Sequence, residues 1–307
     1  MTHRVISIDD GLRLTTVNDL VATPEAVPTR VIDNLRDRFV AETLLFNGGK
    51  ANTLDFAFEQ NSTQYVDEDP EAIAEFAEFP TVAPTSGEII QGRATKLGYR
   101  IVVSREMREY NRVDQVNKAI RKATNRFIRY NDKLLWDALA AAPIPEIAAS
   151  VAWDKDGSDP KYDIAKAMSH VQGGEVLANA ETDYFMADTV VMPSTITPEL
   201  IANEKWATDY RGNIADQSIR YTGRLEAKPV GLDALSVPTM RKDRVLVLQR
   251  GVLGFFKDPR VLEATALKGD GDDLGGNTET FSSRISQIRF VGIDEPFAAC
   301  WITGVTS

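Results

Sequence analysis

The sequence predicts an α+β fold in which one long helix separates an extended excursion from a mixed α/β region. Residues 111–142 carry apolar side chains at spacings of three and four, which is the period of an amphipathic helix. Two stretches with alternating apolar side chains, 53–58 and 93–104, predict half-buried strands before that helix. Beyond residue 143, helix and strand patterns are mixed.

Length and composition are typical of a globular protein. The 307 residues suggest roughly two domains or one large one, and 43% of them are hydrophobic. No apolar run approaches the ~20 residues that span a bilayer, and we expect neither a secretory signal nor a membrane partner. The single cysteine, Cys300, excludes an intrachain disulfide. The net charge of −10 disfavours DNA binding by counterion release.

The segment before the long helix is expected to be largely irregular. One helix is predicted near 28–46, ending at Gly48 and Gly49, and residues 61–92 show no sustained period. Within them, "EFAEFPTVAPTSG" combines Phe76, Phe79 and Val82 with prolines that disfavour both helix and central strand. Long irregular loops in compact domains are usually functional or disordered. We therefore expect this one to become ordered only against another surface.

Charge is distributed unevenly around this excursion. Residues 93–133 contain twelve bases and four acids, a balance of +8. Residues 51–92 contain no Lys or Arg and nine acids, namely Asp55, Glu59, Asp67, Glu68, Asp69, Glu71, Glu75, Glu78 and Glu88. Adjacent blocks of opposite sign can neutralise each other within one subunit or across a subunit boundary.

The long helix is the strongest pattern in the sequence. Asn111 is the expected N-cap, Asp114 places an acid in the first turn, and the helix is expected to stop near Ala142, before "PIPE". At 1.5 Å per residue it would be about 45 Å long, which suits a spine. Successive residues of a helix are rotated by about 100° around its axis. This rotation places five basic residues in one stripe that lies away from the apolar face, namely Lys118, Lys122, Arg126, Arg129 and Lys133.

Further elements are predicted in the mixed region. A helix is expected at 161–178, a buried strand within 183–192, and a second helix that starts with Thr197 as cap and Pro198 at its first position. Residues 268–277 are expected to form a flexible loop. Later strands are predicted at 244–250, 260–267, 282–293 and 297–305.

No pattern predicts a catalytic, cofactor or metal site. His3, His170 and Cys300 do not have the spacing of a zinc motif, and Cys300 lies among apolar residues, which favours a buried structural role. "GDGDD" lacks the ligand spacing of a calcium loop, and "FNGGKANT" lacks the first glycine and the hydroxyl residue of a phosphate loop. The basic stripe has three readings: a nucleic-acid surface, a solvated helix face, or a partner for another subunit's acidic excursion.

Three segments carry a resemblance to a known family. The segments are "AEFAEFPTVAPTSGEIIQGRATKLGYRIVVSREM", "VDQVNKAIRKATNRFIRYNDKLLWDAL" and "IDEPFAACWITGV". They resemble parts of the major capsid proteins of tailed double-stranded DNA bacteriophages, the Hong Kong 97-type fold. In the same order, these parts are the extended loop with its return strand, the spine helix, and the closing strands of the peripheral domain. The resemblance covers most of the chain, through the order and lengths of its elements rather than one diagnostic motif. Encapsulin nanocompartments look like distant relatives.

The resemblance implies a division of the chain. Residues 1–50 would be an N-terminal arm, 51–98 the extended loop, 99–144 with 268–307 the peripheral domain, and 145–267 the axial domain. The loop would lie on a neighbouring subunit and bury Phe76, Phe79 and Val82 only after assembly. Its acids Asp67, Glu68, Asp69 and Glu71 would then face the neighbour's Arg126, Arg129 and Lys133.

The implied function is that of a structural, non-enzymatic shell protein. Hexamers and pentamers would form an icosahedral shell around the viral DNA, assembled in the host cytoplasm, with portal and decoration proteins as partners. About 50 residues before the first strand leave no room for an internal scaffolding domain, so a separate scaffolding protein is expected. Because 51–92 lacks lysine, a Lys–Asn crosslink from the loop is not expected. The alternatives are an encapsulin-like compartment and, in a different class, a soluble α/β enzyme.

Overall fold

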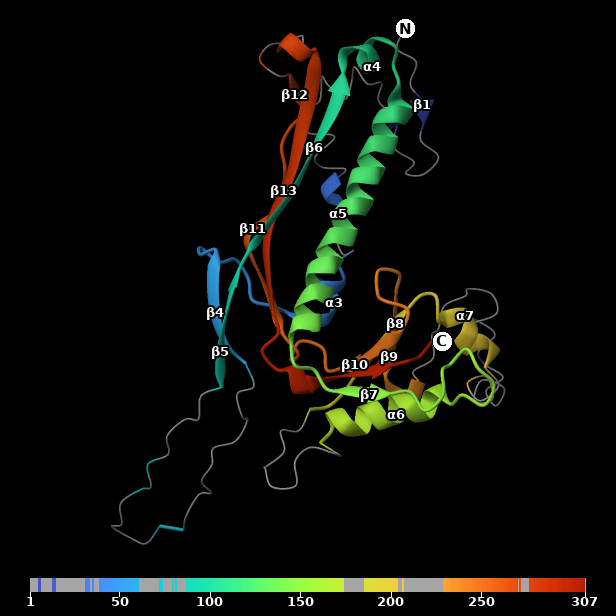
Figure 1. Cartoon of the computed structure of the whole chain (residues 1–307). Coiled ribbons are helices and arrows are strands. Elements are labelled where there is room, and N and C mark those ends of the chain that lie inside the picture. Colours follow the sequence, from blue (N-terminus) through green and yellow to red (C-terminus); the bar gives the residue numbers. More distant parts are fainter. Residues whose placement is uncertain are drawn as a thin grey trace.

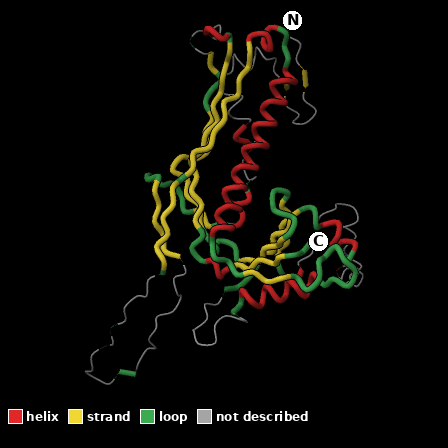
Figure 2. Tube along the Cα trace, viewed as in Figure 1, coloured by secondary structure: helices red, strands yellow, loops and turns green. Residues whose placement is uncertain are grey.

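The computed structural model has two units that meet at one end of a long helix (Figure 1, Figure 2). The residues it describes are 5–6, 13–14, 31–33, 35, 39–60, 72–73, 79, 81, 87–173, 185–203, 206, 229–269, 271 and 276–306. One unit, the spine unit, contains helix α5 and the long strands beside it. The other, the five-stranded unit, extends sideways from the lower end of α5.

The spine unit is organised around strand β13, Thr280–Gly292. β6, Thr95–Ser104, runs antiparallel to it over ten residues, and β11, Phe255–Ala264, pairs with its other edge. Two short strands complete this sheet: β12, Lys268–Gly269, pairs with β13, and β3, Phe46–Asn47, runs parallel to β11. A separate pair joins β1, Val5–Ile6, to β2, Arg13–Leu14.

Helix α5, Val113–Ala141, lies along one face of this sheet, and the predicted spine helix is confirmed. At 1.5 Å per residue its 29 residues span roughly 43 Å. Buried Ile120 and Phe127 share a core with Ile285 of β13. The predicted N-cap is wrong: Asn111 has a positive φ of 48° and belongs to the turn after the short helix α4, Arg105–Glu109, so Arg112 is the first flanking residue of α5.

The five-stranded unit is a mixed sheet in the order β7-β14-β10-β8-β9. β8 is buried along its whole length and β10 at all but its first residue, which fits central strands. Helix α6, Pro160–Val171, packs against β14 and β10, and Asp159 caps it by accepting a hydrogen bond from the Tyr162 amide. The strands are β7 Glu146–Ala148, β8 Thr189–Pro193, β9 Asp233–Val237, β10 Arg244–Leu248 and β14 Ala299–Thr303.

The two units share a core where α5 ends. Leu135 and Leu139 of α5 are buried with residues of the five-stranded sheet and with Leu44 of α3, Val40–Leu44. The C-terminal turns of α5 are therefore packed by both units, and the relative position of the units depends on this junction.

Several sequence-based expectations need correction. The closing strand β14 does not join the spine unit; it pairs with β10 and β7, because its residues are buried on both faces as a central strand requires. The single helix predicted over 28–46 is divided, since Phe39 is extended between helical residue 35 and α3. α6 ends at Val171 rather than at 178, and Thr197 is the first residue of α7, Thr197–Ala202, rather than its cap.

A hairpin forms the base of the predicted excursion. β4, Asp55–Gln60, confirms the first predicted strand, and β5, Glu88–Arg93, was not predicted because it lacks an alternating pattern. Phe56 stacks on Phe290 of β13 with ring centroids 4.6 Å apart, and Phe58 contacts both Phe290 and Phe255 of β11 edge-on. Aromatic packing thus fixes the hairpin to the spine unit.

A buried ion cluster joins α3 to the spine unit. Arg289 of β13 is 2% exposed and donates two hydrogen bonds of 2.8 Å to Asp258 of β11 and one of 2.6 Å to Glu42 of α3. Burial lowers the pKa of the Arg289 guanidinium, but hydrogen bonds and charges from Asp258 and Glu42 outweigh that effect and raise it above its ordinary value. Three chain segments are therefore tied together by one cation.

Candidate interaction surfaces

The predicted loop residues lie largely outside the described part of the chain. This holds for Asp67, Glu68, Asp69, Glu71, Phe76 and Val82. Phe79 is described and is 78% exposed, so its ring lacks a hydrophobic environment within the described subunit. Its burial upon assembly stays a prediction.

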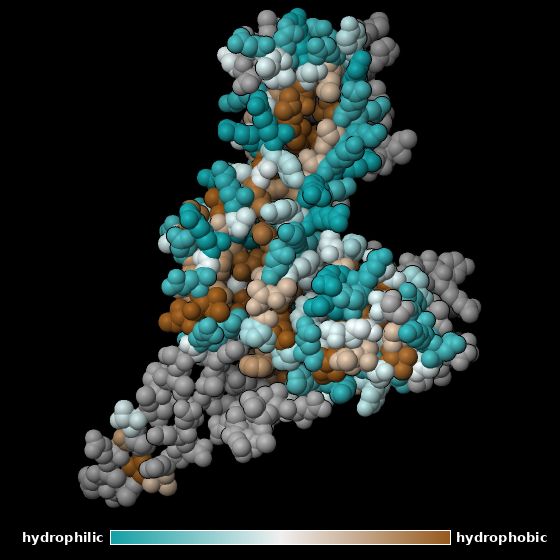
Figure 3. All heavy atoms as spheres, viewed as in Figure 1, coloured by the Kyte–Doolittle hydropathy of each residue, from teal (hydrophilic) through white to brown (hydrophobic). Residues whose placement is uncertain are grey.

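The predicted basic residues of α5 lie on its exposed face. Arg126, Arg129 and Lys133 all project from the side opposite the buried stripe. Lys133 forms an ion pair of 3.4 Å with Asp137 one turn later, and its ammonium lies 5.9 Å from the Tyr130 ring centroid. A band of hydrophilic side chains follows the helix in Figure 3.

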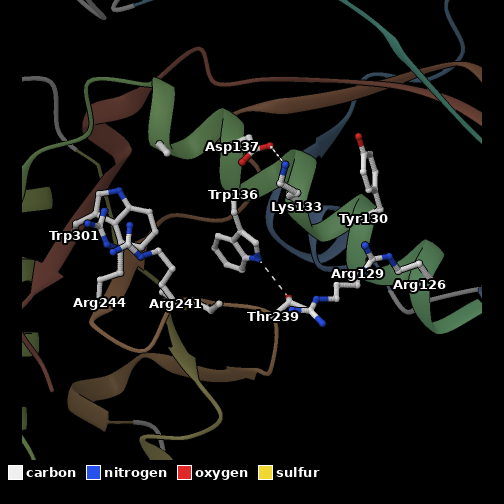
Figure 4. Close-up of a pocket in the computed structure, with 12 residues that line it drawn as sticks. Arg126, Arg129, Tyr130, Lys133, Trp136, Asp137, Thr239, Arg241, Arg244 and Trp301 are labelled. Atoms are coloured by element: carbon white, nitrogen blue, oxygen red, sulfur yellow. Dashed lines mark hydrogen bonds and ion pairs between the residues drawn. The ribbon is translucent and has the colours of Figure 1, made fainter. Parts of the chain in front are cut away.

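These three residues line a hollow of about 580 Å³ between the two units. One wall is the C-terminal half of α5, and the other is the segment 239–244 between β9 and β10, with Trp301 of β14 (Figure 4). The hollow is lined by Arg126, Arg129, Tyr130, Lys133, Trp136, Asp137, Ala140, Thr239, Met240, Arg241, Arg244 and Trp301.

The second wall brings two further arginines into the hollow. Arg241 forms a two-point contact with Asp243, with nitrogen–oxygen distances of 3.1 and 3.0 Å. Arg244 lies over the Trp301 ring, with its guanidinium carbon 5.4 Å from the centroid, and forms an ion pair of 3.5 Å with Glu146. Stacking on an aromatic face and pairing with carboxylates are both typical of arginine, so this wall is held in place by its own contacts.

A buried carboxylate links the two walls. Asp132 of α5 accepts a hydrogen bond of 2.9 Å from the Thr239 hydroxyl and one of 3.3 Å from the Val40 amide. The Trp136 indole donates to the same Thr239 oxygen over 3.4 Å. Burial raises the pKa of the Asp132 carboxyl above its ordinary value, although the hydrogen bonds from Thr239 and Val40 act in the opposite direction. The junction therefore carries a carboxylate that costs free energy when ionised.

The raised pKa of Asp132 predicts a direction for the pH dependence of stability. The folded state binds the proton of Asp132 more tightly than the unfolded state does. The contribution of Asp132 to the stability of the fold is therefore most favourable below its ordinary pKa, and it is lost as the pH rises through the folded-state pKa. Relative to wild type, Asp132→Asn should therefore gain unfolding free energy as the pH rises from below the ordinary carboxyl pKa of 3.8 to neutral. Urea unfolding of both proteins measures this difference; a relative loss over the same range would contradict it.

Sequence reasoning found one wall of the hollow and missed the other. The period of α5 places Arg126, Arg129 and Lys133 on one stripe, but Arg241 and Arg244 lie over a hundred residues later. Their only sequence signal is the basic cluster "RKDR" directly before a predicted strand. Nothing in that pattern shows which helix the cluster faces.

A metal site and a membrane span are both absent from the described residues. Within them, no group of three or more His, Cys, Asp and Glu residues is placed to hold a metal ion. Cys300 is fully buried in β14. Of the helices that the structure describes, none combines the length and the apolar character needed to cross a membrane.

The sequence matches the model of one protein family. That family is described as "Phage capsid protein", and the match covers residues 87–294, which include most of both units. No curated protein matches the sequence.

Solved structures share the fold at low sequence identity. A virus-like particle from Pyrococcus furiosus has a TM-score of 0.57 and 10% identity, over 91% of this chain and 98% of that one. The capsid of Myoviridae phage XM1 gives 0.53 and 14%, over 85% and 89%. Mycobacterium phage Che8 gives 0.53 and 12%, over 84% and 86%. At such identities the likeness concerns the fold alone.

Proposed function

Because the chain belongs to the phage capsid protein family, we propose that it assembles as hexamers and pentamers into a closed icosahedral shell around double-stranded DNA. The observation that carries this proposal is the family match over 87–294, which includes α5 and most strands of both sheets. The Hong Kong 97-type fold expected from the sequence agrees with the capsid folds of the similar structures. The virion capsid is then its location, after assembly in the host cytoplasm.

We propose that different parts of the subunit have different roles in assembly, and that the boundaries of these parts agree with the two units. Residues 1–50 act as an arm, 51–98 as an extended loop based on the β4–β5 hairpin, and the spine unit as a peripheral domain. The five-stranded unit, now including β14, acts as the axial domain that gathers around symmetry axes. We assign no catalytic role to any residue. A separate scaffolding protein, a portal and decoration proteins are the partners expected of such a shell.

Particle formation tests this function directly. The full chain, expressed with and without the scaffolding gene of its genome, should yield closed shells by negative-stain microscopy and fast-sedimenting material. Each subunit should bury well above ~2,000 Å² in total over several neighbours. Monomers or dimers alone under both conditions would overturn the proposal. Shells filled with a specific protein cargo and free of DNA would instead favour the encapsulin-like alternative.

The acidic excursion supports a contact between subunits. We propose that Asp67, Glu68, Asp69 and Glu71 face Arg126, Arg129 and Lys133 of a neighbour, because 51–92 has nine acids and no Lys or Arg while these bases are exposed. Each exposed pair contributes only about 0.2–1 kcal/mol and is screened by salt, but the contact recurs in every subunit.

Charge reversal should therefore impair assembly. Arg126→Glu combined with Arg129→Glu should reduce the yield of closed particles while the far-UV circular dichroism stays unchanged, and Glu68→Lys with Glu71→Lys should partly restore the yield. Sedimentation of the single and combined variants measures both effects. An unaffected yield would identify the stripe as merely solvated, and a loss without rescue would refute this pairing.

The composition of the loop predicts a shell without covalent links from that loop. Residues 51–92 contain no lysine, so the amine required for a Lys–Asn isopeptide bond is missing there. Mature particles boiled in detergent should therefore run as one band near the monomer mass of 33.9 kDa. A ladder of multimers that survives boiling would show that a lysine elsewhere, such as Lys50 or Lys96, forms crosslinks.

A further inference from the structure

The hollow between the two units retains positive charge. Its lining holds five bases, and three of them are paired with the carboxylates of Asp137, Asp243 and Glu146. Arg126 and Arg129, which lie one turn apart on the α5 wall, have no ion-pair or hydrogen-bond partner within the described part of the chain. The hollow therefore keeps two positive charges that a bound anion can neutralise.

Trp136 offers an aromatic surface next to these charges. The chain has four tryptophans, and the other three are at most 5% exposed, whereas Trp136 is only partly buried and lines the hollow. Its indole nitrogen donates a hydrogen bond of 3.4 Å to the Thr239 hydroxyl (Figure 4), which in turn donates to the buried Asp132 over 2.9 Å. The orientation of the ring is therefore fixed before any ligand binds.

Arginines reach the hollow from both of its walls. Arg126 and Arg129 lie on α5, and Arg241 lies on the segment 239–244 across the hollow. A guanidinium group presents its N–H donors in a planar fork that matches the oxygens of a phosphate group. An indole face stacks on the flat rings of nucleobases. The combination favours a ligand that carries both a phosphate group and a nucleobase.

The size and charge of the hollow favour a single nucleotide over a nucleic-acid strand. Its volume of about 580 Å³ falls within the roughly 300–1,000 Å³ of small-molecule sites. Asp137 lies on the α5 wall and disfavours a continuous phosphate backbone, since like charges repel at short range. We propose that the hollow binds a nucleoside phosphate, with its base on Trp136 and its phosphate held by arginines of both walls.

A bound nucleotide would connect the two units. It would contact α5 of the spine unit and Arg241 on the segment that enters β10, and so would stabilise one angle between the units. The contact between subunits proposed above uses Arg126 and Arg129 as well. The nucleotide site is therefore a property of the unassembled subunit, and binding does not depend on the shell function.

Calorimetry tests both halves of the ligand. Unassembled full-length protein, separated from particles by sedimentation, should bind adenosine monophosphate at one site per chain. Adenosine lacks the phosphate and inorganic phosphate lacks the base, so each should bind at least about tenfold more weakly. The absence of binding would overturn the proposal, and so would an equal affinity for adenosine or for inorganic phosphate.

Tryptophan fluorescence locates the base. Because the other three tryptophans are at most 5% exposed, adenosine monophosphate should quench mainly the emission of Trp136. Trp136→Phe keeps an aromatic ring and should remove most of the quenching. Quenching that is unchanged in this variant would place the base elsewhere and refute the site.

Charge-neutralising variants locate the phosphate. Arg129→Gln and Arg241→Gln should each weaken the binding of adenosine monophosphate at least about tenfold. The matched controls are Lys122→Gln and Lys242→Gln, which make the same charge change at exposed positions outside the hollow and should weaken binding less than about twofold. Circular dichroism checks that all four variants are folded.

Two further outcomes would contradict the proposal. Equal effects of the hollow variants and their controls would show that only the overall charge of the protein matters. Tighter binding of a short single-stranded DNA than of adenosine monophosphate, lost in Arg241→Gln, would identify a surface for a nucleic-acid strand instead of a nucleotide site.

The outcomes separate this inference from the shell function. Closed wild-type particles, with no nucleotide binding by the unassembled subunit, would leave the shell intact and refute the site. Nucleotide binding without any closed particle would support the site and refute the shell.

Discussion

Replacing Arg289 with Met is expected to lower the free energy of unfolding by about 3–5 kcal/mol, the cost of breaking a buried ion pair by removing one partner. The guanidinium is 2% exposed and neutralises Asp258 and Glu42 at 2.6–2.8 Å. Methionine fills part of the volume but leaves two carboxylates without their cation. Because these carboxylates come from β11 and α3, the variant should also loosen α3 from the spine unit.

Chemical unfolding followed by tryptophan fluorescence measures this loss. The matched control is Arg93→Met, which breaks an ion pair of 3.6 Å with Asp55 where the two side chains are 74% and 79% exposed. Such an exposed pair is worth at most about 1 kcal/mol. If Arg289→Met cost no more than Arg93→Met, the cluster would not hold the three segments together.

Replacing Gly92 with Val is expected to release the β4–β5 hairpin from the spine unit at a cost of about 1–3 kcal/mol, the usual range for overpacking. A Cβ atom at this position would lie 2.5 Å from Cε2 and 2.9 Å from Cζ of Phe290. The Phe290 ring cannot easily move, because it stacks on Phe56 and contacts Phe58 and Phe255. The hairpin must shift instead.

Limited trypsin digestion reports on this release, because Arg93 and Lys96 lie at the base of the hairpin. Cleavage at these residues should be faster in Gly92→Val than in wild type, and the yield of closed particles should fall. Gln91→Val is the matched control, since it adds the same side chain at an exposed position of the same strand. Equal digestion of both variants would show that the aromatic cluster does not anchor the hairpin.

Periodicity predicted the elements whose burial is one-sided. α5, β4 and β6 were found because one face of each is buried and the other is exposed, which leaves a period of 3.6 or 2 in the sequence. β14 was found as a strand but assigned to the wrong unit. Its residues are buried on both faces, so its sequence carries no information about which neighbours it has. β5 and β7 were missed because each is short or lacks alternation.

The candidate site was predictable only where it lies on one element. The stripe of Arg126, Arg129 and Lys133 follows from helical geometry alone. The pairing of that stripe with Arg241 and Arg244 depends on the shared core around Leu135, which is a property of the tertiary fold. The buried link through Asp132 and Thr239 likewise joins residues 107 positions apart.

The continuity of β5 and β6 has a mechanical consequence. Only Ala94 separates the two strands, and β6 is bonded to β13 from Thr95 through Ser104. A pull on the loop is therefore transmitted along β6, at right angles to the hydrogen bonds of an antiparallel ladder. Under a force in this direction, the hydrogen bonds between β6 and β13 must break together, because they cannot open one after another. A force that pulls on the loop would thus act along the direction in which this sheet is strongest.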